Sequence, residues 1–327
     1  MTIADRQAIL IAGMHRSGTS AVAGAVSLLG GAPPAHMIPA SLDNPLGFWE
    51  SAVVIGVNDT ILRAGKSTWY DCLGLDCSTF DERERATATT FVMASIMAEF
   101  ADDRLLLIKD PRLCLLLGFW LPTLREMQIS PATLLVLRHP CEVLDSIAMR
   151  DALPIELIAA LWLRYMLAAE YDSRGCPRHI LPYHMLLLDW RHALLRAGEA
   201  AAIAWPVPFE LVTSRMDALL KRELQHHHAL SSAQQRAGVP LGRWADEVYQ
   251  ALLLLSANPT DLIQSQRLDR VHGEFQRWCQ DHGRAWSANV LAGHPIHAQH
   301  PAFEISVTWD DAASRLQSNH IDNTNNT

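Results

Sequence analysis

Lysine is scarce in this 327-residue chain: only Lys66, Lys109 and Lys221 occur, and the other cationic side chains are arginines. Lys and Arg together number 27 against 35 Asp and Glu, which gives a formal net charge of -8. Dedicated nucleic-acid-binding proteins are normally basic, so this balance argues against that class. Because lysine is rare, the place of each lysine in the fold is informative.

Cysteine and long apolar runs are scarce as well. Six cysteines are too few for a disulfide framework in a chain of this length, and we expect reduced thiols. The most apolar stretch, 105–121, is interrupted by Lys-Asp-Pro-Arg at 109–112, whereas a membrane-spanning helix needs about 20 apolar residues. The N-terminus also lacks a basic flank before an apolar run. We therefore expect a soluble, cytoplasmic protein with no membrane span.

Apolar residues nevertheless make up 49% of the chain, so a large core is expected. Short apolar runs at 8–12, 104–108 and 132–137 are typical of parallel strands that are buried on both faces, and 179–181 is a further strand candidate. Helical spacing covers 19–29, 87–100, 141–150 and 155–166. These patterns predict an α/β fold with a central parallel sheet, in which ligands bind at the carboxyl ends of the strands.

The chain divides into three predicted parts. Residues 1–205 form the α/β core, and residues 206–286 form a mainly helical part packed on it, with helices at 218–237 and 244–255. Residues 287–327 lose periodicity, and we expect an irregular, disordered tail. His226, His227 and His228 point about 100° apart on a helix, so they do not converge on one metal ion. We interpret them as a solvated helix face and predict no metal site.

The segment 13–20, Gly-Met-His-Arg-Ser-Gly-Thr-Ser, follows a strand and opens a helix. Its spacing matches the P-loop pattern, except that Thr19 stands where the lysine should be. Backbone N–H groups and the helix N-terminus still make an anion nest, and Arg16 can supply the positive charge. An ordinary glycine turn between strand and helix is the alternative. The missing lysine argues against a kinase, in which it neutralises the nucleotide phosphates.

This loop resembles the 5′-phosphosulfate loop of sulfotransferases that use 3′-phosphoadenosine 5′-phosphosulfate (PAPS). Arg138, with a proline two residues later and Ser146 eight positions on, resembles the 3′-phosphate site of the same family. Three further segments, 44–50, 109–112 and 181–187, resemble bacterial members, although His184 replaces their usual glutamate. The resemblance covers about residues 8 to 200.

The resemblance implies a three-layer, P-loop kinase-like α/β fold with a helical C-terminal extension, PAPS as the donor, and no required metal. It implies a small-molecule or glycan acceptor and leaves the oligomeric state open. The implied donor-binding residues are His15, Arg16, Ser17, Gly18, Thr19, Ser20, Arg138, Ser146 and Tyr183.

Sulfuryl transfer to an alcohol needs a base for the hydroxyl proton and cations for the charge that develops on the leaving phosphate. Arg16 and Lys109 are the candidate cations. Glu50 is the first candidate base, with Asp110 and His15 as alternatives, and Glu50 can equally be a carboxylate that stabilises a helix N-terminus. The alternative functions are a P-loop small-molecule kinase and a non-catalytic nucleotide-binding protein.

Overall fold

The computed structural model describes residues 6–40, 44, 47–73, 75, 80–221 and 233–291. Within them, four strands form one sheet: β1 (Gln7–Ala12), β2 (Leu105–Lys109), β3 (Ser130–Leu137) and β4 (Arg178–Pro182). The strand order is β2-β1-β3-β4, and each neighbouring pair is parallel. The four expected strands are therefore present, and their carboxyl ends meet at one edge of the sheet.

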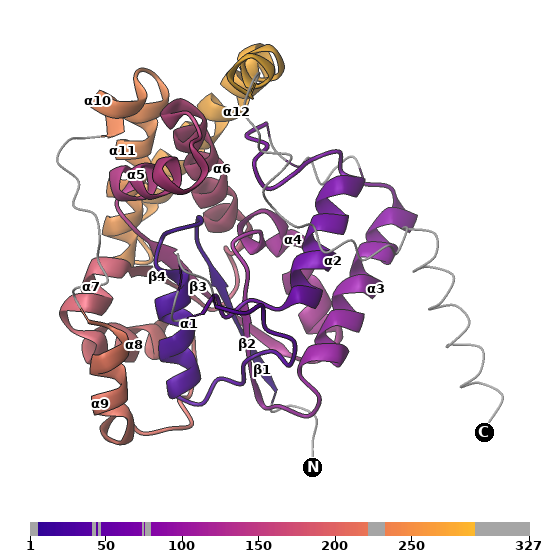
Figure 1. Cartoon of the computed structure of the whole chain (residues 1–327), viewed down its shortest axis with the longest axis vertical. Coiled ribbons are helices and arrows are strands. Elements are labelled where there is room, and N and C mark those ends of the chain that lie inside the picture. The colour runs from indigo at the N-terminus through magenta and orange to yellow at the C-terminus, as the bar shows by residue number, and fades with distance from the viewer. Residues whose placement is uncertain are drawn as a thin grey trace.

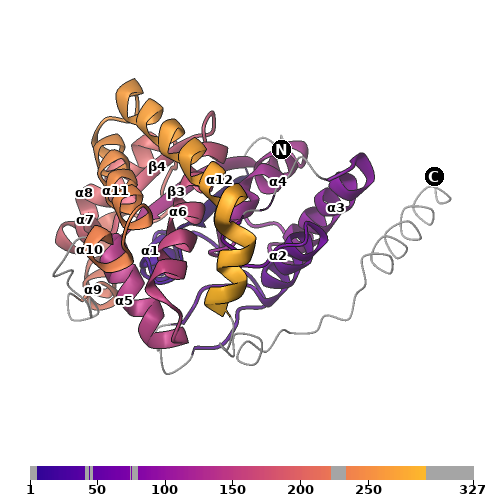
Figure 2. The same ribbon diagram turned by 90° about the horizontal axis from the view of Figure 1, so that it is seen from above.

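Helices cover both faces of this sheet. Along β1, Ala8 and Leu10 lie in one apolar core and Ile9 and Ile11 lie in another, because successive strand residues point to opposite faces. The core around Ile9 is closed by α1 (Thr19–Leu28), α7 (Tyr183–Leu188), α8 (Trp190–Ala200) and α9 (Phe209–Leu219). These four helices gather on one side of the sheet in Figures 1 and 2.

The second, larger core lies on the opposite face. It is built from α2 (Ala52–Ala64), α3 (Glu82–Glu99), α4 (Leu113–Glu126), α5 (Pro140–Asp151), α6 (Ile155–Asp172), α10 (Ala233–Ala237), α11 (Leu241–Ala257) and α12 (Leu262–Leu291). This arrangement confirms the predicted fold class: a central parallel sheet between helical layers, with additional helices at the C-terminal side.

The helix boundaries differ from the sequence expectation at two places. A continuous helix over 218–237 is wrong, because α9 ends at Leu219 and Lys221 is not helical. His226, His227 and His228 lie outside the described residues. Helix α12 continues to Leu291, beyond the boundary expected at 287, and residues 292–327 are outside the described part. The division into core, helical part and tail stays a prediction.

Two further findings concern disulfides and membrane-spanning helices. Among the cysteines that the structure describes, none forms a disulfide. In the described ranges, no helix combines the length and the apolar character that a membrane-spanning segment needs.

Candidate functional site

The turn between β1 and α1 has the backbone of an anion-binding loop. Arg16 and Gly18 adopt the left-handed conformation, with φ of 67° and 89°. The backbone N–H of Ser17 donates to the Met14 carbonyl at 3.1 Å. Gly18 is the N-cap of α1 and contributes no side-chain cap to the first turn. Successive N–H groups in such a turn, together with a helix N-terminus, form a nest for an oxyanion.

Gly18 lies directly against Tyr183, the first residue of α7. A Cβ atom at position 18 would come within 2.4 Å of the Tyr183 ring, so a larger residue would displace that ring. The Arg138 guanidinium lies 5.4 Å from the centroid of the same ring. Burial raises the pKa of the Tyr183 phenol above its ordinary value. The ends of β1, β3 and β4 therefore bring the loop, Arg138 and Tyr183 together.

Arg138 and Ser146 are connected to the loop through Arg16. Arg138 Nη1 donates to the Arg16 carbonyl at 3.0 Å, and its Nε donates to Glu142 Oε2 at 2.7 Å. Arg16 Nε donates to Ser146 Oγ at 2.9 Å. In the part of the chain that the structure describes, Arg138 Nη2 and Ser17 Oγ are buried and have no hydrogen-bond partner. Buried polar atoms normally have partners, so these two atoms are available to a water molecule or a polar ligand.

At the end of β2, oxygen atoms from two other segments surround the Lys109 ammonium. Its Nζ lies 3.0 Å from the Phe48 carbonyl oxygen and 3.4 Å from Ser20 Oγ, and it also donates to Glu50 Oε1. The Lys109 side chain is 2% exposed and that of Glu50 is 11% exposed, so this ion pair is buried. Asn44 Nδ2 donates to Ser20 Oγ at 3.3 Å, which ties Asn44 to the start of α1.

The two candidate carboxylates differ in their surroundings. Burial raises the pKa of Glu50, and the attraction of Lys109 opposes this shift without cancelling it. Asp110 is fully buried, with Oδ2 accepting from Asn58 Nδ2 at 3.2 Å and Oδ1 accepting from the Arg112 backbone N–H at 2.8 Å. Since both oxygens of Asp110 are engaged, Glu50 is the better placed of the two to accept a proton.

Sequence reasoning missed the residues that hold Asp110. Arg112 Nε donates to Asp59 Oδ1 at 2.6 Å, and its Nη1 donates to Asp110 Oδ1 at 3.2 Å. Trp120 Nε1 donates to Asn58 Oδ1 at 2.8 Å. Asn58 and Asp59 belong to α2 and Trp120 belongs to α4, and neither helix was expected. Arg112 was visible in the 109–112 segment, but nothing in the sequence identified its partners.

His15 and Thr19 lie on other sides of the loop. The His15 ring centroid is 4.9 Å from that of Trp69 and 5.9 Å from that of Tyr165, so His15 borders an aromatic wall. Thr19 is buried, and its Cγ2 would be 2.9 Å from a Cβ atom at Gly13. The side chain at the usual lysine position therefore packs against the first glycine of the loop.

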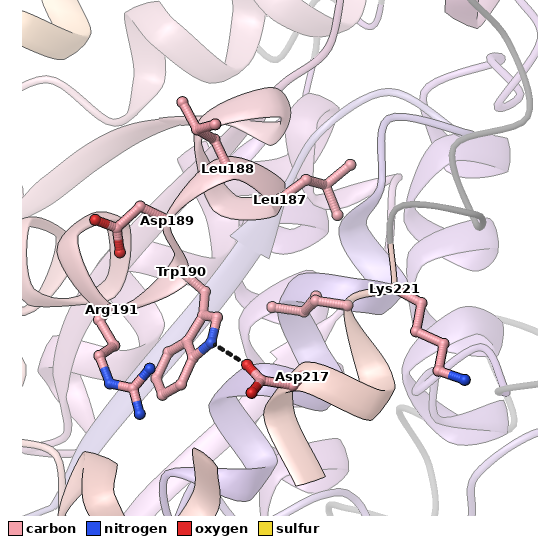
Figure 3. A pocket seen from close by; sticks show the side chains of 8 residues that line it. Leu187, Leu188, Asp189, Trp190, Arg191, Asp217 and Lys221 are labelled. Atoms are coloured by element: carbon pink, nitrogen blue, oxygen red, sulfur yellow. Dashed lines mark hydrogen bonds between the residues drawn. The ribbon is translucent and has the colours of Figure 1, made fainter. Parts of the chain in front are cut away.

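No group of three or more His, Cys, Asp or Glu side chains suited to a metal ion occurs among the described residues. A surface pocket of about 370 Å³ lies between α7, the start of α8 and the end of α9. In it, Trp190 Nε1 donates to Asp217 Oδ1 at 2.8 Å, and the Arg191 guanidinium lies 4.3 Å from the Trp190 ring centroid (Figure 3). The residues assigned to the donor site do not line this pocket.

The sequence matches no protein-family model, and a search of curated proteins also found no match. Among solved structures, the chain is similar to the sulfotransferase domain from the Synechococcus PCC 7002 olefin synthase. The identity is 14% and the TM-score is 0.40, over 73% of this chain and 94% of that chain. A similarity at this level does not assign a function, which has to be argued from the site itself.

Proposed function

We propose that the protein is a sulfotransferase that moves a sulfuryl group from PAPS to a hydroxyl group of a carbohydrate or small metabolite. One observation carries the proposal: Arg16, Arg138 and Ser146 converge on an anion-binding loop, where Arg138 Nη2 and Ser17 Oγ have no partner among the described residues. Unsatisfied buried donors beside such a loop suit a ligand with phosphate groups. A cytoplasmic location belongs to the same proposal.

The donor-binding roles follow the resemblance, residue by residue. The loop amides, with Arg16 and the neighbouring residues 15–20, bind the 5′-phosphosulfate. Arg138 and Ser146 bind the 3′-phosphate, for which a planar guanidinium is well suited. Tyr183 lies beside both groups and lines the adenine side. The close fit of Gly18 against the Tyr183 ring supports one compact nucleotide site rather than two separate ones.

The buried pair beside the loop supports the chemical step. Glu50 accepts the proton of the acceptor hydroxyl, because its raised pKa brings it closer to the operating pH than an ordinary carboxylate. Lys109 and Arg16 stabilise the negative charge that develops on the leaving phosphate. Since Lys109 already contacts Glu50, proton removal and charge stabilisation are supplied by adjacent groups.

A P-loop kinase is the main competing function, and Lys109 argues against it. In P-loop kinases the hydroxyl at the position of Ser20 is a magnesium ligand. In this chain an ammonium group lies 3.4 Å from that hydroxyl, so a cation of the protein itself stands beside the metal ligand. Thr19, which stands in place of the P-loop lysine, also argues against a kinase.

A transfer assay tests the proposal. The protein is incubated with sulfur-35-labelled PAPS, a chelator and a panel of hydroxyl acceptors, and we expect label on at least one acceptor. Glu50→Gln should lower the rate by about 10²-fold or more while leaving donor binding nearly intact. Glu156→Gln, at an exposed carboxylate of α6, is the matched control and should react normally. Phosphoryl transfer from ATP instead would identify a kinase, and donor binding without any transfer would favour a non-catalytic binding protein.

A further inference from the structure

A short segment between α1 and α2, residues 32–38, connects the strand that carries Lys109 with the loop that carries the candidate base; we call it the strap. At its start, the Ala32 N–H donates to the Leu105 carbonyl at 2.8 Å, and the Leu107 N–H donates to the Ala32 carbonyl at 2.9 Å. Both partners belong to β2, which ends at Lys109. One end of the strap is therefore fixed to the strand of the candidate cation.

The other end of the strap pairs with the backbone around Glu50. The Ile38 N–H donates to the Glu50 carbonyl at 2.8 Å, and the Ala52 N–H donates to the His36 carbonyl at 2.9 Å. These two bonds make up one antiparallel bridge. The strap thus holds the backbone of Glu50, while Lys109 contacts the carboxylate of the same residue.

Glu99, the last residue of α3, holds the middle of the strap. Its Oε2 accepts from the His36 backbone N–H at 2.9 Å, and its Oε1 lies 2.9 Å from His36 Nδ1. Its backbone carbonyl accepts from the Ala35 N–H at 3.2 Å. The Glu99 side chain is 0% exposed, whereas that of His36 is 65% exposed. One buried residue therefore fixes two consecutive strap residues, next to the bridge with Glu50.

The position of Glu99 does not favour the stability of its own helix. A carboxylate in the last turn lies at the negative end of the helix dipole, and a buried carboxylate also loses its hydration. At the other end of α3, Asp81 forms a capping box with Glu84, where a carboxylate is favourable. Asp81 therefore stabilises the helix, whereas the contacts of Glu99 serve the strap.

We propose that Glu99 is a positioning residue: by fixing His36 and the strap, it keeps the Glu50 carboxylate against Lys109. The contacts stand by themselves, and only their use in sulfuryl transfer rests on the proposed function. Hydrogen bonds are directional, so they define where the strap lies more closely than apolar packing would. Such control matters at an active site, because a displacement of about 1 Å can lower a rate by about 10²-fold.

The first test needs no activity and measures whether Glu99 and Lys109 are coupled. Within the described residues these two side chains form no hydrogen bond or ion pair with each other, so independent effects should add. If Glu99 positions Glu50, Glu99→Met frees the carboxylate to reach water. Lys109→Met should then lower the melting temperature by only about half as much as in the wild type. Additive losses would overturn the proposal.

Asp81→Ala is the matched control at the opposite end of the same helix. It removes an N-cap, so it should lower the melting temperature by about 2–4 °C. The further fall caused by Lys109→Met should equal that in the wild type. If Asp81→Ala reduces the effect of Lys109→Met as much as Glu99→Met does, the coupling reflects a loosened α3 and Glu99 has no positioning role.

The second test separates the chemical step from donor binding. With sulfur-35-labelled PAPS and an acceptor labelled in the panel, Glu99→Met should lower kcat by at least about 10-fold. Calorimetry should show unchanged affinity for adenosine 3′,5′-bisphosphate. In a Glu50→Gln background, Glu99→Met should cause no further loss, because the residue that it positions is already inactive. An equal loss in both backgrounds would show that Glu99 does not act through Glu50.

Glu99→Gln is the conservative variant. Its amide oxygen can accept from the His36 backbone N–H and its NH₂ group can donate to Nδ1 of a neutral imidazole, so both contacts survive. We expect its kcat and its coupling to Lys109 to be close to those of the wild type. A loss as large as in Glu99→Met would assign the effect to the charge of Glu99 and refute positioning through His36.

The two tests also distinguish this inference from the proposed function. If no acceptor is labelled but the unfolding coupling is present, the sulfotransferase assignment fails, and Glu99 still positions Glu50 against Lys109. If transfer occurs and the coupling is absent, the proposed function stands and the positioning role of Glu99 is refuted.

Discussion

Lys109→Met probes the buried ion pair between Lys109 and Glu50 in the candidate site. The substitution nearly conserves side-chain length but leaves the Glu50 carboxylate, whose side chain is 11% exposed, without its cation. Removing one partner of a buried pair typically costs about 3–5 kcal/mol. For domains of about 150–250 residues, each kcal/mol corresponds to roughly 2–4 °C, so we expect the melting temperature to fall by roughly 6–20 °C at pH 8.

The loss should shrink as the pH falls. The pKa of Glu50 is raised above its ordinary value, so its protonation favours the folded state. The contribution of this group to stability is therefore greatest below pH 4.5 and is lost as the pH rises through the raised pKa. Lys109→Met removes the attraction that opposes this shift, so the pKa of Glu50 should rise further. The stability of the variant should then fall over a wider pH range and by a larger amount than that of the wild type. Denaturant unfolding at pH 5, 6.5 and 8 measures both effects.

The control for this prediction is the double variant Lys109→Met/Glu50→Gln, in which no unpaired carboxylate remains. It should recover most of the lost stability, and its stability should lack the decline with pH that the Glu50 carboxyl causes. If Lys109→Met is as stable as the wild type at pH 8, or if the double variant is no more stable than Lys109→Met, the buried pair is not what the contacts indicate.

Two further predictions use other parts of the fold. Gly18→Ala should destabilise the protein by more than Gly175→Ala: both positions have positive φ, which costs about 1–2 kcal/mol for alanine, but only at 18 would the new Cβ meet a ring within 2.4 Å, with nothing within 4 Å at 175. Equal losses in urea unfolding would contradict this. Burial lowers the pKa of His179 to about 4, so stability should fall by up to about 1.4 kcal/mol per pH unit between pH 6.5 and 4. His179→Gln should flatten that slope, and an unchanged slope would show that His179 does not carry it.

The first three strands were predictable because each contains a short apolar run that stops at a polar residue or a glycine, and the fourth stops at Pro182. Helix α4 was not predictable from the sequence. Residues Leu113 to Leu117 are all buried, so the helix has almost no polar face and its sequence shows no helical alternation of polar and apolar residues. The end of α9 at Leu219 was missed for a different reason. No proline or glycine interrupts 209–237, so the helical pattern continues through a break that local sequence does not mark.

Much of the candidate site followed from one topological rule. Arg138, Lys109 and the 13–20 loop each end a strand, and the carboxyl ends of parallel strands share an edge. The contact between Lys109 and Glu50 required more, because it depends on the path of residues 47–50 beside the start of α1. Trp49 there has φ of 60°, which is rare for a bulky residue and which no sequence rule predicts.

Binding of adenosine 3′,5′-bisphosphate, measured by calorimetry in the presence of a chelator, tests the central claim most directly. We predict binding without magnesium in the wild type and its loss in Arg138→Ala, because this variant removes both the Nη2 donor and the link to Arg16. Binding of ATP with magnesium, and none of the bisphosphate, would contradict the account.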